Sequence, residues 1–136
     1  MIEEAKRWLL KALDDLKVAE HEMALPANER VTSAVCFHLQ QFVEKVFKAF
    51  LVAHGRSFPR THNLSFLKML CAEIDKDFAA LPVDELSIYA VEMRYPGEPL
   101  RPSQEECEAF LRLAQAIKAL IEVKIGVKLD ELAHET

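Results

Sequence analysis

Three long stretches of the chain carry apolar side chains every three or four positions, which is the spacing of one face of an α-helix. Two shorter stretches follow the same spacing, and no stretch has the pattern that is typical of a strand. Because the connections between them are short, the sequence predicts an all-α protein, an antiparallel up-and-down bundle of three long and two short helices. The expected helices cover about residues 2–23, 30–54, 62–75, 84–93 and 103–125.

The second long stretch, at about residues 30–54, is apolar on more than one side. Phe37, Phe47 and Leu51 lie well off its main apolar face. A helix with this pattern is usually buried on more than one side. We therefore expect it either at the centre of the bundle or in an interface of an oligomer.

The last long helix has clear signals at both ends. Ser103 and Glu106 form a capping box, in which each side chain satisfies a free backbone N–H group of the other residue. Gly126 stands at its end, a position where glycine is common. A chain of 136 residues fits one domain. We therefore expect a single bundle over residues 2–126 and a flexible C-terminal tail over residues 127–136.

The composition narrows the class of protein. Lysine and arginine total 17 against 22 aspartates and glutamates, a net charge of −5 that argues against a general nucleic-acid coat or a polybasic membrane binder. No apolar run reaches the roughly 18 residues of a membrane-spanning helix, and the acidic start at Glu3 and Glu4 is unlike a secretory signal. Three widely spaced cysteines indicate free thiols in a reducing compartment. We therefore expect a cytoplasmic protein that does not bind membranes.

Positive charge gathers in one part of this acidic chain. Residues 30–62 contain five lysines and arginines against one acid, a local charge of +4 that leaves −9 for the rest. The polar sector of the second helix carries a stripe of donors at three- and four-residue steps, and such donors suit a phosphate or a base. The alternative is a solvated helix face with one histidine hydrogen-bonded in the core. The stripe consists of His38, Gln41, Lys45 and Lys48.

Two further groups are candidates for binding an anion. Arg60 and His62 precede an expected helix start, where free N–H groups and a partial positive charge favour an anion. The alternative is that a capping residue such as Asn63 uses those donors. Arg94 and Tyr95 suit phosphate contact and base stacking, and their alternative role is to turn the chain.

No metal or cofactor site is expected. The histidines and cysteines lack the His-x3-His and Cys-x2-Cys spacings of metal sites. Three glycines are too few for a glycine-rich phosphate loop. The cysteines have no base at catalytic spacing, so we interpret them as inert buried thiols and assign no catalytic residue. They are Cys36, Cys71 and Cys107.

Four motifs follow one another along the chain: Phe37-His38-Leu39-Gln40-Gln41; Glu44-Lys45 with Lys48-Ala49; Phe58-Pro59-Arg60-Thr61-His62-Asn63-Leu64; and Tyr89 with Arg94-Tyr95-Pro96. Together they resemble the HEPN domain, named for higher eukaryotes and prokaryotes nucleotide-binding, over about residues 2–125. The resemblance implies an all-α bundle that often pairs as a homodimer and binds a nucleotide or a nucleotide-like ligand. It further implies a nucleotidyltransferase as the protein partner, in a two-component system of the toxin–antitoxin type.

Several HEPN branches are metal-independent ribonucleases, which carry an Arg, four to six residues and a His at the entry to the last long helix. This sequence departs from that pattern. Arg94 and Arg101 precede the last helix, but the next histidine is His134. Arg56 and His62 have the right spacing but precede the third helix. The sequence thus favours nucleotide binding, and the alternatives are a ribonuclease acting on RNA and a protein-interaction module without a ligand.

Overall fold

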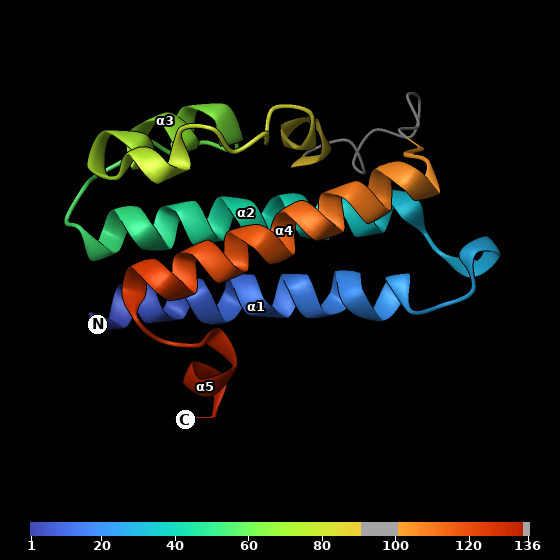
Figure 1. The fold of residues 1–136 in the computed structure, drawn as a ribbon, viewed down its shortest axis with the longest axis horizontal. Helices are drawn as coiled ribbons and strands as arrows, with labels where there is room; N and C mark the ends of the chain where they lie inside the picture. The colour runs from blue at the N-terminus through green and yellow to red at the C-terminus, as the bar shows by residue number, and fades with distance from the viewer. Residues whose placement is uncertain (91–100, 135–136) are drawn as a thin grey trace.

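The computed structural model describes residues 1–90 and 101–134, and every regular element within these two ranges is helical. Three α-helices of 21 or 22 residues form the body of the molecule (Figure 1). The all-α helical bundle that the periodicity predicts is thereby confirmed. The elements, with η for a 3-10 helix, are α1 (Glu3–Met23), η1 (Ala27–Glu29), α2 (Thr32–Ala53), α3 (Leu64–Ile74), η2 (Lys76–Phe78), η3 (Leu86–Ala90), α4 (Gln104–Ile125) and α5 (Leu129–Ala133).

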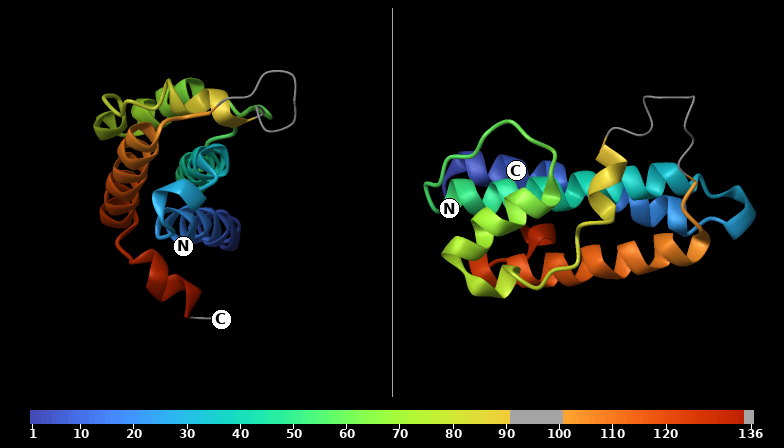
Figure 2. Two further views of the ribbon diagram at one scale, coloured as in Figure 1. Left: turned by 90° about the vertical axis from the view of Figure 1, so that its right-hand side faces the viewer. Right: turned by 90° about the horizontal axis from the view of Figure 1, so that it is seen from above.

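The long helices lie side by side, and their directions are set by the connections. α1 and α2 form an antiparallel pair joined through the short turn η1 (Figure 1). α4 runs in the same direction as α2, because the chain passes along α3 and η3 and returns to the end where α2 begins (Figure 2). A contact between the two helix starts agrees with this order, since the sulfur atoms of Cys36 and Cys107 lie 3.8 Å apart.

The two short helices expected in the middle of the chain differ in kind. The first, at about 62–75, is α3. Of the second, at about 84–93, the described residues form the 3-10 helix η3, and residues 91–100 lie outside the described ranges. Leu86 and Tyr89 are buried three positions apart, which is the period of a 3-10 helix.

The segment after α4 contains a helix where the sequence predicts a flexible tail. Gly126 ends α4 with φ of 75°, in the left-handed region that favours glycine. The chain then forms α5, whose Leu129 and Leu132 are 1% and 4% exposed. α5 packs on α1, so these two leucines hold the segment to the bundle. Two apolar residues are too few to reveal a helical period in the sequence.

α2 is the central helix, because α1, α3, α4 and η3 all pack against it. Phe47 and Leu51 are fully buried and Phe37 is half-buried. The expected central position of this helix in the bundle is therefore observed, and its part in an oligomer interface stays a prediction. Each such side chain stabilises the fold by roughly 1.5–3 kcal/mol when fully buried. With Phe47 and Leu51 inside the bundle, they offer no docking surface for another protein.

The capping box at the start of α4 is confirmed. The Ser103 Oγ accepts a hydrogen bond from the Glu106 N–H, and the Glu106 carboxylate accepts one from the Ser103 N–H, both at 3.0 Å. Two of the free donors of the helix end are thus satisfied. The helix start is fixed by its own sequence.

All three cysteines are free and buried. Burial raises the pKa of the Cys71 thiol to about 12. A hydrogen bond with the Cys107 sulfur, together with burial, raises the pKa of Cys36. Since the thiolate is the reactive form of cysteine, the raised pKa values support the interpretation of Cys36 and Cys71 as inert thiols. The same hydrogen bond lowers the pKa of Cys107, so for that residue the interpretation rests on its complete burial.

We expect the native protein to resist thiol reagents at pH 8, because Cys71 stays protonated well above that pH and all three thiols are shielded. Labelling with Ellman's reagent should be roughly a hundredfold or more slower in the native protein than in the chain unfolded by guanidinium. In the unfolded chain, all three thiols should react with the reagent. Rapid labelling of even one thiol in the native state would contradict this account of the core.

Candidate functional site

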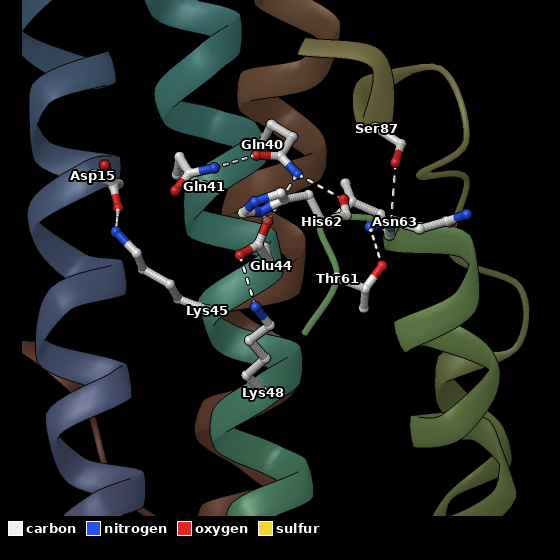
Figure 3. A network of polar contacts seen from close by, with 11 residues as sticks. Asp15, Gln40, Gln41, Glu44, Lys45, Lys48, Thr61, His62, Asn63 and Ser87 are labelled. Carbon is white, nitrogen blue, oxygen red and sulfur yellow. Dashed lines mark hydrogen bonds and ion pairs between the residues drawn. The ribbon is translucent and has the colours of Figure 1, made fainter. Parts of the chain in front are cut away.

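Two buried carboxylates organise the polar face of α2 (Figure 3). Asp15 of α1 is 9% exposed and Glu44 of α2 is 3% exposed. A buried charge is costly unless it is both paired and hydrogen-bonded. Each carboxylate meets this need with a lysine and an imidazole. The result is a network of polar contacts that spans α1, α2 and the loop before α3.

Asp15 joins α1 to α2. Its Oδ1 lies 2.8 Å from His38 Nδ1, and its Oδ2 accepts a hydrogen bond from Lys45 Nζ at 2.5 Å. The side chains of His38 and Lys45 are 29% and 22% exposed, so each keeps access to solvent. The other ring nitrogen of His38, Nε2, bonds no residue in the described part of the chain. Asp15 therefore orients two donors without enclosing them.

Glu44 joins α2 to the loop before α3. Its Oε1 accepts a hydrogen bond from Gln40 Nε2 at 3.2 Å and lies 2.9 Å from His62 Nδ1, while its Oε2 accepts one from Lys48 Nζ at 2.9 Å. Gln40 is fully buried and also donates to the backbone carbonyl of His62 at 3.1 Å. Its own Oε1 accepts a hydrogen bond from Gln41 at 2.7 Å. The chain of contacts thus runs from the half-exposed Gln41 through the interior to the exposed His62.

Lys48 belongs to the interior rather than to the surface. The residue is 6% exposed, and its ammonium lies 5.5 Å from the ring centroid of Trp8 and 5.8 Å from that of Phe58. A cation over an aromatic face is attracted by the ring's electrons. The Lys48 ammonium therefore interacts with Glu44 and with two aromatic rings, and we assign Lys48 a structural role.

The start of α3 is already satisfied by its own neighbours. The Asn63 Oδ1 accepts a hydrogen bond from the Phe66 N–H at 3.1 Å, and the Ser87 Oγ accepts one from the Leu64 N–H at 3.0 Å. These are donors that would otherwise attract an anion. The capping alternative therefore describes this helix start. Arg60 is exposed and has no ion-pair partner among the described residues.

The fold brings most of the predicted site residues together. Arg60 lies two residues before the network in the sequence, and its part in a site stays a prediction. Arg94 and Tyr95 lie outside the described residues, so their part stays a prediction as well. The candidates that the network joins are His38, Gln41, Lys45, Lys48 and His62.

Asp15, which binds His38 and Lys45, is not among the site residues predicted from the sequence. Asp15 lies within the apolar stripe of α1, three residues after Ala12 and one before Leu16. A carboxylate in such a position needs a partner, and that need is the signal that could have revealed it. Trp8 and Gln40 are also absent from the predicted site, yet both contact the network.

The interior of the network is saturated. Across residues 1–90 and 101–134, no buried side-chain nitrogen or oxygen lacks a hydrogen-bond partner. Within the same ranges, no three His, Cys, Asp or Glu side chains converge to hold a metal ion. None of the helices described there is long and apolar enough to cross a membrane. Within the network, free hydrogen-bonding capacity is therefore offered where His38, Gln41, Lys45 and His62 reach the surface.

The chain is similar to known proteins over the whole bundle. The chain matches the family described as the HEPN domain over residues 5–124, which take in α1 to α4 almost completely. No curated protein matches it. Among solved structures, the crystal structure of TT1696 from Thermus thermophilus is similar, at 27% sequence identity and a TM-score of 0.65. That similarity covers 90% of this chain and 99% of the other.

Glu44→Leu should destabilise the protein strongly, because it leaves the Lys48 ammonium buried without its counter-charge. Breaking a buried pair in this way costs about 3–5 kcal/mol. Replacing both residues, as Glu44→Leu with Lys48→Met, should recover most of that loss. Urea unfolding of the wild type, both single variants and the double variant measures the coupling.

An exposed acid of α4 provides the control. Glu108→Gln changes a charge with no role in the network and should shift the free energy of unfolding by at most about 0.5 kcal/mol. The free energy of unfolding lost by the double variant could instead equal the sum of the losses of the two single variants. Glu44 and Lys48 would then act independently, and the network would not hold the fold as described.

Proposed function

The chain belongs to the HEPN domain family, and on that premise we propose that it binds the phosphate groups of a nucleotide along the polar face of α2. The observation that supports this most is the pair of buried acids, which fix solvent-reaching donors on one face. The proposed contacts are His38, Gln41, Lys45 and His62, with Arg60 at the edge.

The donors are of the kind that phosphate groups accept. A lysine presents a point charge, and a histidine or glutamine presents directional N–H groups. The guanidinium group of an arginine adds two parallel N–H donors that can bind two oxygens of one phosphate. The His62 side chain is 50% exposed, more than those of His38 and Lys45, so the face opens most widely toward the loop before α3.

Charge balance limits how strongly this face attracts an anion by itself. Asp15 and Glu44 cancel the charges of Lys45 and Lys48 one for one. Net positive charge then comes from Arg60. A phosphate would share Lys45 with Asp15 rather than bind a free cation. The acids thus act as positioning groups that hold the donors before the ligand arrives.

We also propose how the protein works with others. It acts in the cytoplasm as a homodimer and as the helical partner of a nucleotidyltransferase, in a two-component system of the toxin–antitoxin type. Membership of the HEPN family supports this role. The separation of charge along the chain, +4 in residues 30–62 and −9 elsewhere, would orient such a partner by electrostatic attraction.

A ribonuclease is the second candidate, and the contact between Asp15 and His38 favours it. A carboxylate on Nδ1 fixes the tautomer and orientation of an imidazole, which is how a catalytic base is often held. No arginine contacts His38 within the described residues, and phosphoryl chemistry needs such a charge for the developing negative oxygens. If this activity exists, His38→Ala should abolish cleavage of a short RNA, whereas cleavage that survives excludes His38 as the base.

Nucleotide binding should be visible as thermal stabilisation. At a concentration about 100 times Kd, a ligand of the native state adds about 2.7 kcal/mol and raises Tm by several degrees. Lys45→Gln and Arg60→Gln should each weaken ATP binding by about tenfold, because each removes a charged contact to phosphate. Melting curves of the variants with and without ATP measure this.

The control is Lys17→Gln, which removes an exposed charge of α1 that takes no part in the network and should leave the shift unchanged. The proposal fails if no nucleotide stabilises the wild type. It fails equally if Lys17→Gln reduces the shift as much as Lys45→Gln, since binding would then follow overall charge.

A further inference from the structure

Trp8 stands at the edge of the proposed site. It lies on the side of α1 that faces the α2 network, because Lys48 covers its indole at 5.5 Å from the ring centroid. Asp15 lies seven residues further along α1 and meets Lys45 on the same side. Seven residues are two helical turns, about 10 Å. The indole and the Asp15 cluster therefore mark two ends of one seam between α1 and α2.

A hollow of about 270 Å³ opens beside the indole, lined by Glu4, Arg7, Trp8 and Lys11. Lys48 is almost fully buried and does not line this hollow. Trp8 is half-buried, which keeps part of its ring accessible. An accessible aromatic face backed by a fixed cation is a platform on which a flat ring can stack.

The charges around the hollow indicate how a bound ligand would be oriented. Arg7 and Lys11 are exposed, and in the described part of the chain neither is paired with an acid. Lys11 lies between Trp8 and Asp15 along the same edge of α1, while Glu4 lies one turn before Trp8. A phosphate is repelled by the carboxylate of Glu4 and attracted by Lys11. A ligand with a ring on Trp8 would therefore extend its phosphates toward Lys45.

We propose that Trp8 is the base-stacking residue of this protein, and that its ligand is a nucleoside polyphosphate with its base in the hollow. Arg7 and Lys11 flank the base and guide the phosphates into the seam. This inference rests on the proposed function and deepens it, because it adds a contact to the base where the α2 face offers contacts to phosphate. The predicted Tyr95 stacking contact is not required for it.

The single tryptophan of the chain makes the test direct. The native protein is titrated with ATP and, separately, with inorganic triphosphate, and the indole fluorescence is followed. ATP should quench the emission of Trp8 and bind about tenfold or more tightly than triphosphate, because stacking adds to the phosphate contacts. Triphosphate should bind without comparable quenching.

Variants separate the base contact from the phosphate contacts. Trp8→Leu should weaken ATP binding about tenfold by calorimetry and leave triphosphate binding within about twofold, which also shows that the variant is folded. Trp8→Phe keeps an aromatic face and should retain most of the ATP affinity. If Trp8→Leu does not fold, the fluorescence titration of the wild type and Trp8→Phe still decide.

The outcomes distinguish the two proposals. If ATP and triphosphate bind equally and Trp8→Leu changes neither, phosphate binding stands and the stacking role of Trp8 is overturned. If ATP binds without quenching Trp8, the base lies elsewhere and the inference is overturned. If neither ligand binds, the proposed function and this inference both fail.

Discussion

A carboxylate shielded almost completely from water has to be neutralised, and the way Glu44 meets this requirement shapes the molecule around it. Its lysine partner, Lys48, lies against Trp8 of α1 and Phe58 of the loop before α3. His62 reaches the same carboxylate from that loop. One buried charge therefore ties together two helices and a loop that hydrophobic packing alone would fix less firmly.

The same need to neutralise buried carboxylates also arranges the proposed binding groups. Asp15 and Glu44 hold imidazole and ammonium groups in fixed positions, and His38, Lys45 and His62 among them stay partly open to solvent. Groups that are held before a ligand arrives lose less freedom when it binds. The seam between α1 and α2 then combines hydrogen-bond donors suited to phosphate at one end with an indole at the other. The ligand that we propose, a nucleotide, would use both ends.

The fold could be predicted from the sequence because period, capping and turn signals agree along the chain. The central position of α2 is visible in Phe47 and Leu51, and the start of α4 in Ser103. The site could be predicted only in part. The stripe on α2 is a local pattern, but its contact with Asp15 joins residues 23 and 30 positions apart and depends on how α1 packs. α5 escaped prediction because tertiary burial, not local period, stabilises it.

Mapping where a nucleotide binds would test the proposed seam between α1 and α2. Amide and indole N–H resonances of the labelled protein are recorded by NMR while ATP is added. We expect shifts along the α1–α2 seam, including the Trp8 indole N–H and the amides around His38 and Lys45, with little change in the second half of α4 and in α5. Shifts confined to α4 and α5, or no shifts at saturating ATP, would contradict it.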